Sequence, residues 1–71
     1  MIYKIQEEIC YFWNLKGVEP NALILGEDVI NELLATNHLV QEVNTDKNYV
    51  CGCEILSIDY ANPKKIQAVL I

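Results

Sequence analysis

The sequence predicts a two-layer α+β domain in which two helices pack on a four-stranded mixed sheet. Three features predict it: helical apolar spacing near the start, a strand, glycine and helix written without a break over Pro20–Leu34, and extended segments separated by turn residues afterwards. The expected order is helix, strand, helix, strand, strand, strand. Residues 1–71 form one domain, because no linker or change in composition divides them.

The first helix is expected over Tyr3–Lys16. Its apolar side chains recur at three- and four-residue steps and gather on one side at about 100° per residue: Ile5, Ile9, Phe12 and Trp13. Gly17 stands where a left-handed helix cap would fall. We expect the large Trp13 side chain in the core.

The stretch Pro20–Leu34 predicts a buried strand at Ala22–Leu25, because its apolar run is unbroken rather than alternating. Gly26 would permit the sharp turn, and Glu27 and Asp28 would occupy the first turn of the next helix, where negative charge complements the helix dipole. Four side chains make the expected buried stripe: Val29, Ile30, Leu33 and Leu34. Asn37 is expected to end this helix.

Three further strands are expected in the second half of the chain: Leu39–Val43, Tyr49–Ile58 and Lys65–Ile71. Turn-forming residues fill Asn44–Asn48 and Tyr60–Lys64, so the strands would form a C-terminal antiparallel meander. Gly52, inside the middle strand, indicates a bulge or a place where Trp13 or Phe12 crosses closely.

Charge and composition narrow the classes of function. Ten acidic residues stand against five lysines and no arginine, so we expect no nucleic-acid partner. Two acids at the second helix start would also repel a phosphate there. The longest apolar run is far shorter than a membrane span, and no signal peptide is recognisable, so we expect a cytoplasmic protein without a membrane partner.

The cysteines are the sharpest chemical signal. Cys51 and Cys53 would point to the same face of a strand and could offer two thiolates to a metal, with Cys10 and His38 completing four ligands. Structural zinc sites usually use a different cysteine spacing, on turns, so the expectation is three small buried hydrophobic residues and no cofactor. A lone histidine without a fixed partner does not predict catalysis, and we expect no enzyme.

Two regions favour protein contact. Tyr11 and Leu15 lie away from the apolar centre of the first helix, where exposed aromatic and aliphatic side chains could begin an interface. The last strand ends Ala68–Ile71 with no charged side chain, so an exposed edge there would invite pairing with another strand. The expected interface residues are therefore Tyr11, Leu15, Val69 and Ile71, and the expected partner is a second copy.

The stretch Glu19–Leu34, followed by Gly52–Ile58 and Ile66–Leu70, resembles small proteins and head-protein segments of tailed bacteriophages and prophages. The resemblance is carried by structural positions: Pro20, Leu23 to Gly26, Leu33, Leu34 and Gly52. A capsid subunit is several times longer, so the resemblance is to one peripheral subdomain.

The resemblance implies a non-enzymatic assembly or protein-interaction protein. Two alternatives stand beside it: an acidic regulatory or inhibitor protein that imitates nucleic-acid charge, and a small metal-binding module built on Cys51 and Cys53.

Overall fold

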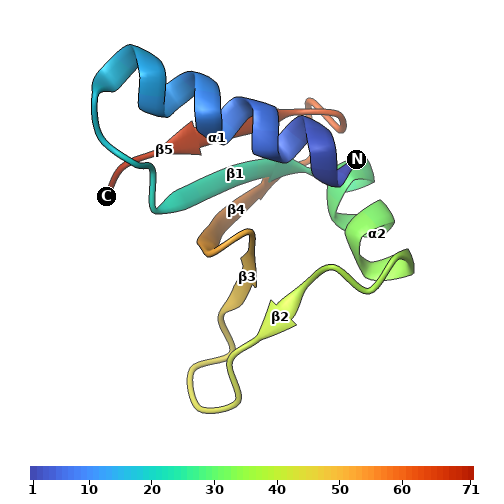
Figure 1. Ribbon diagram of the computed structural model, residues 1–71. Helices are drawn as coiled ribbons and strands as arrows, with labels where there is room; N and C mark the ends of the chain where they lie inside the picture. Colours follow the sequence, from blue (N-terminus) through green and yellow to red (C-terminus); the bar gives the residue numbers. More distant parts are fainter.

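The computed structural model describes all residues from Met1 to Ile71 and contains two helices and one mixed sheet (Figure 1). The elements are α1 Ile2–Lys16, β1 Ala22–Gly26, α2 Glu27–Ala35, β2 Val40–Gln41, β3 Asn48–Val50, β4 Cys53–Asp59 and β5 Ile66–Val69. The α+β class and the predicted succession of helices and strands are confirmed. The sheet has five strands rather than four, in the order β2-β3-β4-β1-β5.

The extra strand arises at Cys51 and Gly52, which divide the predicted strand Tyr49–Ile58 in two. Both residues have positive φ, 52° and 78°, as the two central residues of a type I′ hairpin turn require, and Val50 pairs with Cys53 across the turn. A Cβ at Gly52 would meet nothing within 4 Å, so no aromatic side chain crosses there. The prediction of a bulge or a close crossing was therefore wrong.

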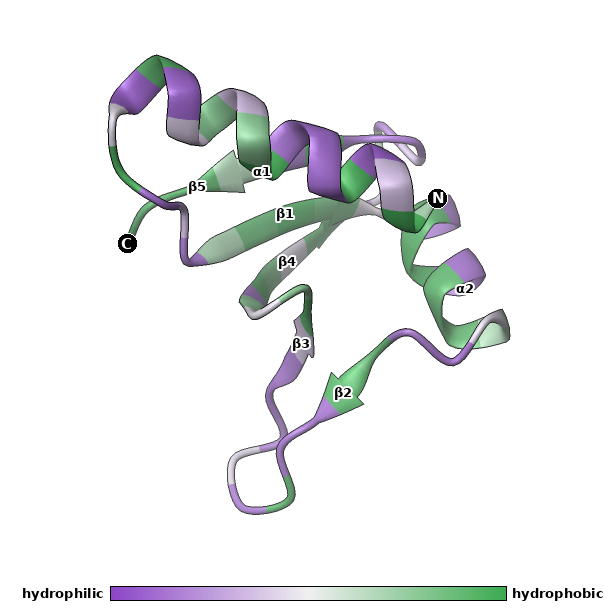
Figure 2. Ribbon diagram, viewed as in Figure 1, coloured by the Kyte–Doolittle hydropathy of each residue, from purple (hydrophilic) through white to green (hydrophobic).

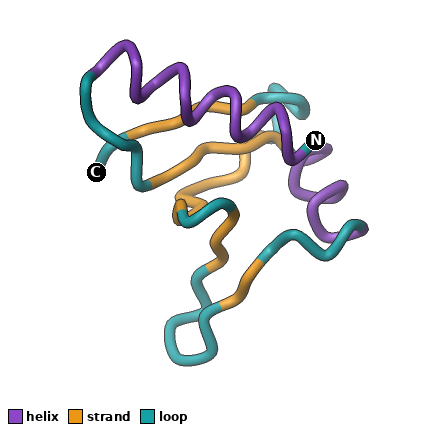
Figure 3. The backbone as a smooth tube through the Cα atoms, viewed as in Figure 1, coloured by secondary structure: helices purple, strands orange, loops and turns teal.

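The last strand also departs from the predicted meander. Strands β2, β3 and β4 pair antiparallel in sequence order, but β5 crosses to the far side of β1 and pairs antiparallel with it. Strand β1 pairs parallel with β4 on one side and antiparallel with β5 on the other, so it lies inside the sheet, as its unbroken apolar run predicts. The paired segments are shorter than predicted at Leu39–Val43 and Lys65–Ile71, and Figure 3 shows loop on both sides of β2.

Both helices contribute to one core on a single face of the sheet. The cluster joins Ile5 of α1 to residues of β1, α2, β3 and β4: Leu23, Leu25, Val29, Ile30, Leu33, Val50 and Cys53. Figure 2 shows β1 hydrophobic along its length, whereas hydrophobic and hydrophilic bands alternate along α1. Ile5 is the one buried residue of α1, so this helix is held largely by half-buried contacts.

Two residues predicted in the core lie outside it. Trp13 is 49% exposed, because it lies about 80° around α1 from Ile5, at the flank of the buried stripe. Leu34 is 60% exposed, because it lies about 100° from Leu33, at the centre of the stripe of α2. The apolar residues at both positions therefore remain at the surface.

Gly17 and Asn37 end the two helices as predicted, whereas Gly26 is needed for a reason other than the predicted sharp turn. Gly17 adopts φ 75° and donates its N–H to Trp13 O at 2.8 Å, and Asn37 after α2 adopts φ 60°. Gly26, by contrast, has φ −70°, which any residue can adopt. A Cβ there would overlap the backbone of Asn62 and Pro63, so the position requires glycine for space.

The start of α2 is capped from the far end of the chain. The N–H groups of Asp28 and Val29 donate to Pro63 O at 2.9 and 3.4 Å. These are among the four N–H groups that a helix start leaves without an intrahelical partner. The strand-to-helix turn is thus closed by the connection between β4 and β5, which passes across it.

Candidate protein-contact surface

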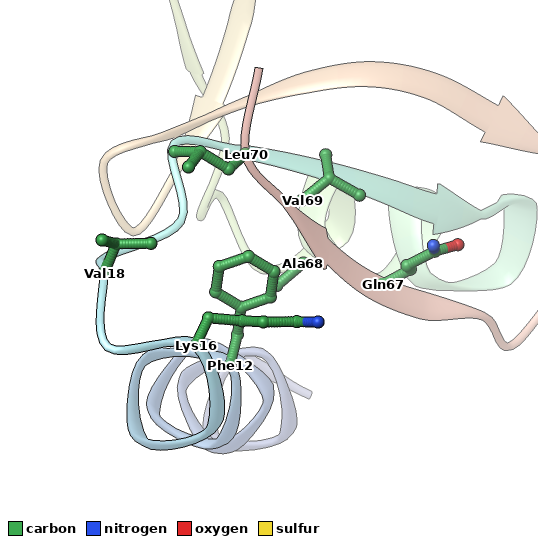
Figure 4. A pocket seen from close by; sticks show the side chains of 7 residues that line it. All are labelled: Phe12, Lys16, Val18, Gln67, Ala68, Val69 and Leu70. Atoms are coloured by element: carbon green, nitrogen blue, oxygen red, sulfur yellow. The ribbon is translucent and has the colours of Figure 1, made fainter.

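A groove of about 620 Å³ lies between the C-terminal half of α1 and β5 (Figure 4). Seven residues line it, of which all but Lys16 and Gln67 are hydrophobic: Phe12, Lys16, Val18, Gln67, Ala68, Val69 and Leu70. Figure 4 shows Phe12 reaching from α1 toward Ala68, with the Lys16 side chain running beside it. The groove is therefore apolar with one positive charge at its wall.

The groove adjoins a strand edge that has no partner. Strand β5 is last in the sheet and pairs with β1 alone. Gly26 donates to Lys65 O at 2.8 Å, so the backbone groups of Gln67 and Val69, two and four residues on, also point to β1. The N–H and C=O groups of the alternate residues, Ile66 and Ala68, therefore point to the open side.

No lysine, proline or bulge lies within the short paired segment of this edge, and Lys64 and Lys65 stand directly before it. Protein edges are commonly blunted by lysine, proline or a bulge, and Ile66–Val69 contains none of these in its regular pairing with β1. We call the groove residues together with the open backbone of β5 the β5 edge surface. Its chemistry suits an additional extended strand, because unpaired backbone groups lie next to apolar side chains.

The predicted interface residues fall partly on this surface. Val69 lines the groove, whereas Leu15 lies about 60° around α1 from Phe12 and is not among the lining residues. Leu15 and Tyr11 are each 64% exposed, and Ile71 is 70% exposed beyond the end of β5. Tyr11 lies about 100° from Phe12, on the outer surface of α1.

Several residues of the surface are not foreseen by the sequence pattern. The pattern places Phe12 on the apolar side of the first helix and Val18 in the connector that follows this helix. Phe12 is half-buried and Val18 and Leu70 are exposed, so these three form the apolar wall. The available signal in the sequence is that apolar residues stand on both sides of Gly17, at Leu15 and Val18, and fill the last four positions, Ala68–Ile71.

The accessible surface of the whole chain is close to that expected for a folded monomer of its size. Eleven of 71 residues are buried, and the accessible surface is 4797 Å². A folded monomer of 8.1 kDa is expected to expose about 4,500 Å².

The candidate metal ligands are not brought together. Cys51 lies exposed in the I′ turn, whereas Cys53 is buried in β4, where its Sγ lies 3.5 Å from Pro20 O. Cys10 is an exposed thiol on α1, and His38 lies 2.7 Å from Thr36 Oγ1 through its Nδ1. No three His, Cys, Asp or Glu side chains are arranged to hold a metal ion. The expectation that all three cysteines are buried was wrong for Cys10 and Cys51.

The two neighbouring thiols are also poor nucleophiles. Desolvation by surrounding protein atoms raises the pKa of both Cys51 and Cys53. Because the thiolate is the reactive and metal-binding form, a raised pKa lowers the fraction that can react at neutral pH.

The acidic side chains are interleaved with lysines. Glu54 pairs with Lys47 at 3.1 Å, and Asp59 pairs with Lys65 at 3.4 Å. Near the start of α1, Lys4 and Lys64 lie among acids of both helices: Glu7, Glu8, Asp28 and Glu32. Six of the ten acids therefore lie beside a lysine, which argues against a single acidic face of the kind that imitates nucleic-acid charge.

The connection that leads into β5 is ordered by Asp59. Its Oδ1 accepts the N–H groups of Ala61 and Asn62, each at 3.0 Å, and its Oδ2 accepts Asn62 Nδ2 at 3.2 Å. The hydrogen bonds from Asn62, with the nearby Lys65 ammonium, lower the pKa of the Asp59 carboxyl. The same connection supplies Pro63 O to α2, so the charge of Asp59 supports both neighbouring elements.

Asp59→Asn should reduce the acid sensitivity of the fold. A lowered pKa in the folded state means that the ionised carboxylate adds stability above the unfolded pKa, and this is lost as the pH falls through the folded pKa. Urea midpoints measured from neutral to acidic pH should therefore fall less steeply in Asp59→Asn than in the unmodified protein. At neutral pH the midpoint of Asp59→Asn should be the lower of the two. Glu19→Gln, a change at an exposed carboxylate outside both helices, is the control. If the urea midpoints of Asp59→Asn and the unmodified protein fell equally steeply toward acidic pH, the stabilising role of the Asp59 carboxylate would be contradicted.

Neither helix has the length and apolarity that crossing a membrane requires. Comparisons with protein-family models, with curated proteins and with solved structures gave no match.

Proposed function

We propose that this chain is a small non-enzymatic assembly protein that works by self-association through the β5 edge surface. The observation that carries the proposal is the juxtaposition of an unpaired, uncharged strand edge with the apolar groove beside it. The resemblance to small phage and prophage proteins supports an assembly role in that setting, within the cytoplasm. The free thiols and the lone histidine have no part in it.

The energetic reason is the cost of leaving the edge unpaired beside apolar surface. In water the β5 backbone groups can be solvated, but Phe12, Val18 and Leu70 keep apolar area exposed next to them. A strand added at the edge would satisfy the backbone groups and cover these side chains in one step. Strand addition therefore uses both features of the surface, whereas a small ligand would use the groove alone.

Ala68→Pro tests the surface with little expected change to the single chain. The Ala68 N–H points to the open side, so proline there removes no hydrogen bond to β1 but blocks pairing with an added strand. We expect the unmodified protein to sediment as a dimer or larger species at tens of micromolar. Ala68→Pro should sediment as a monomer with the same far-ultraviolet circular dichroism.

Gln41→Pro is the matched control at the opposite edge of the sheet. Glu42 donates to Lys47 O at 2.8 Å, so by alternation the Gln41 N–H points away from β3. This variant should associate as the unmodified protein does. A strict monomer at high micromolar concentration without any substitution, or association that survives Ala68→Pro, would overturn the proposal.

A further inference from the structure

The outward backbone groups of the last segment are symmetric about Ala68. Ile66 and Ala68 point to the open side, and the pattern continues past β5, because the Ile71 N–H donates to Asn21 Oδ1 at 2.9 Å on the β1 side. Leu70 lies between Val69 and Ile71, whose backbone groups point to the β1 side, so the backbone groups of Leu70 also point to the open side. Three outward residues at even spacing make an edge that is complementary to itself when a second copy runs antiparallel.

We propose that the occupant of the β5 edge surface is β5 of a second copy, antiparallel about a twofold axis at Ala68; this rests on the proposed function. In this arrangement Ala68 pairs with its own copy, and Ile66 pairs with Leu70 of the second copy. The sheets of the two copies become one continuous sheet. A twofold contact of this kind is closed, so it yields a dimer and leaves no free β5 edge.

The apolar groove then receives a defined side chain. The groove is bounded by Val18 and Leu70 at one end, and Leu70 lies opposite Ile66 of the second copy. Side chains of directly opposed residues on neighbouring strands lie close enough to pack. Ile66, which is half-buried within one copy, would thus be covered by the groove of the other copy, and this contact occurs twice.

Charge supports the antiparallel direction. Glu8 borders Ile66 at one end of β5, whereas Lys16 borders Ala68 and Leu70 at the other end. The twofold axis brings Glu8 of each copy to Lys16 of the other, and neither residue has an ion-pair partner in its own chain. Parallel strands in register would instead place Glu8 against Glu8.

Lysines near Glu8 do not reverse this complementarity. Lys4 also borders the Ile66 end, but it lies one helical turn farther than Glu8 from the level of Phe12. Lys64 precedes Ile66 by two residues, so it lies farther from the axis at Ala68. Glu7 also borders Ile66, but it lies about 140° around α1 from Phe12, whereas Glu8 lies about 40° from it, so Glu8 is the carboxylate of this end on the groove side of the helix.

Charge-swap variants test the arrangement. Glu8→Lys would place two lysines at each contact, and Lys16→Glu would place two glutamates there. Each single variant should dimerise more weakly, with a dissociation constant raised on the order of tenfold, as expected for two surface ion pairs turned repulsive. The double variant Glu8→Lys/Lys16→Glu should regain the affinity of the unmodified protein, because the attraction is restored with the signs exchanged.

Mixing the two single variants gives the sharpest result. A Glu8→Lys chain and a Lys16→Glu chain form attractive contacts only with each other, so native mass spectrometry with one chain ¹⁵N-labelled should show mainly heterodimer. Glu27→Lys, on α2, is the matched charge control and should leave the dissociation constant unchanged.

The outcomes separate the inference from the proposed function. Dimers of unaltered affinity in both single variants would overturn the β5 pairing and leave self-association standing. Weakened single variants without recovery on mixing would overturn the Glu8 to Lys16 contact. An unmodified protein that is monomeric and binds only an extended segment of another protein would overturn both.

Discussion

Gly26→Ala should destabilise the domain by about 3 to 5 kcal/mol, more than any other single substitution considered for this chain. The added methyl group would overlap the backbone of Asn62 and Pro63, which cannot rotate away as a flexible side chain can. Overpacking costs about 1 to 3 kcal/mol, and displacing the connection would break two hydrogen bonds from Asp28 and Val29, worth about 1 kcal/mol each. A domain of 71 residues has a total stability of about 4 to 11 kcal/mol.

Urea unfolding followed by circular dichroism measures this loss, and Gly17→Ala is the matched control. Gly17 has φ 75°, and a methyl group added there would meet no other atom within 4 Å, so alanine carries only the left-handed backbone cost of about 1 to 2 kcal/mol. We expect Gly26→Ala to lose more than Gly17→Ala. A loss no larger than that of Gly17→Ala would show that the connection moves aside without strain.

The first half of the fold was predictable because its signals are local. The helical spacing of α1, the unbroken apolar run of β1 and the acids at the start of α2 each lie within one element. Gly17 and Asn37 mark helix ends by backbone conformation, a property of the residue itself. These features need no knowledge of which distant segments meet.

The second half was less predictable because strand partners are set by distant contacts. Nothing within Ile66–Val69 states that it pairs with β1 rather than β4. The need for glycine at Gly26 likewise comes from Pro63, 37 positions along the chain, and not from the local turn. Cys51 and Gly52 did carry a local turn signal, but the apolar residues on both sides also fit one continuous strand.

Only part of the candidate surface could be predicted from the sequence, because the groove depends on contacts between distant segments. The uncharged final strand and the exposure of Tyr11 and Leu15 follow from local pattern. The groove does not, because it exists only where the end of α1 meets the open side of β5. Phe12 shows the difference: its helical position predicts burial, and its partner strand decides that only half of it is covered.

Ile5→Ala is the second substitution with a large expected effect. Ile5 is fully buried and is the one buried residue of α1, so its truncation removes the main anchor of a 15-residue helix. Cutting a buried isoleucine to alanine costs about 2 to 5 kcal/mol, and relaxation of a loosely held helix favours the lower part of this range. Alanine itself suits a helix interior, so the loss reflects packing and not helix propensity.

Hydrogen exchange distinguishes detachment of α1 from general weakening. If Ile5 anchors the helix, Ile5→Ala should accelerate exchange of the α1 amides more than exchange of the β1 amides. Strand β1 lies between β4 and β5 and is hydrogen-bonded to both, so it should stay protected. Leu15→Ala, a truncation at an exposed position of the same helix, should change neither stability nor exchange appreciably. Detachment would also remove the Phe12 wall of the groove, so self-association should weaken with it. Uniform acceleration across α1 and β1 would instead mean that the helix and sheet unfold as one unit.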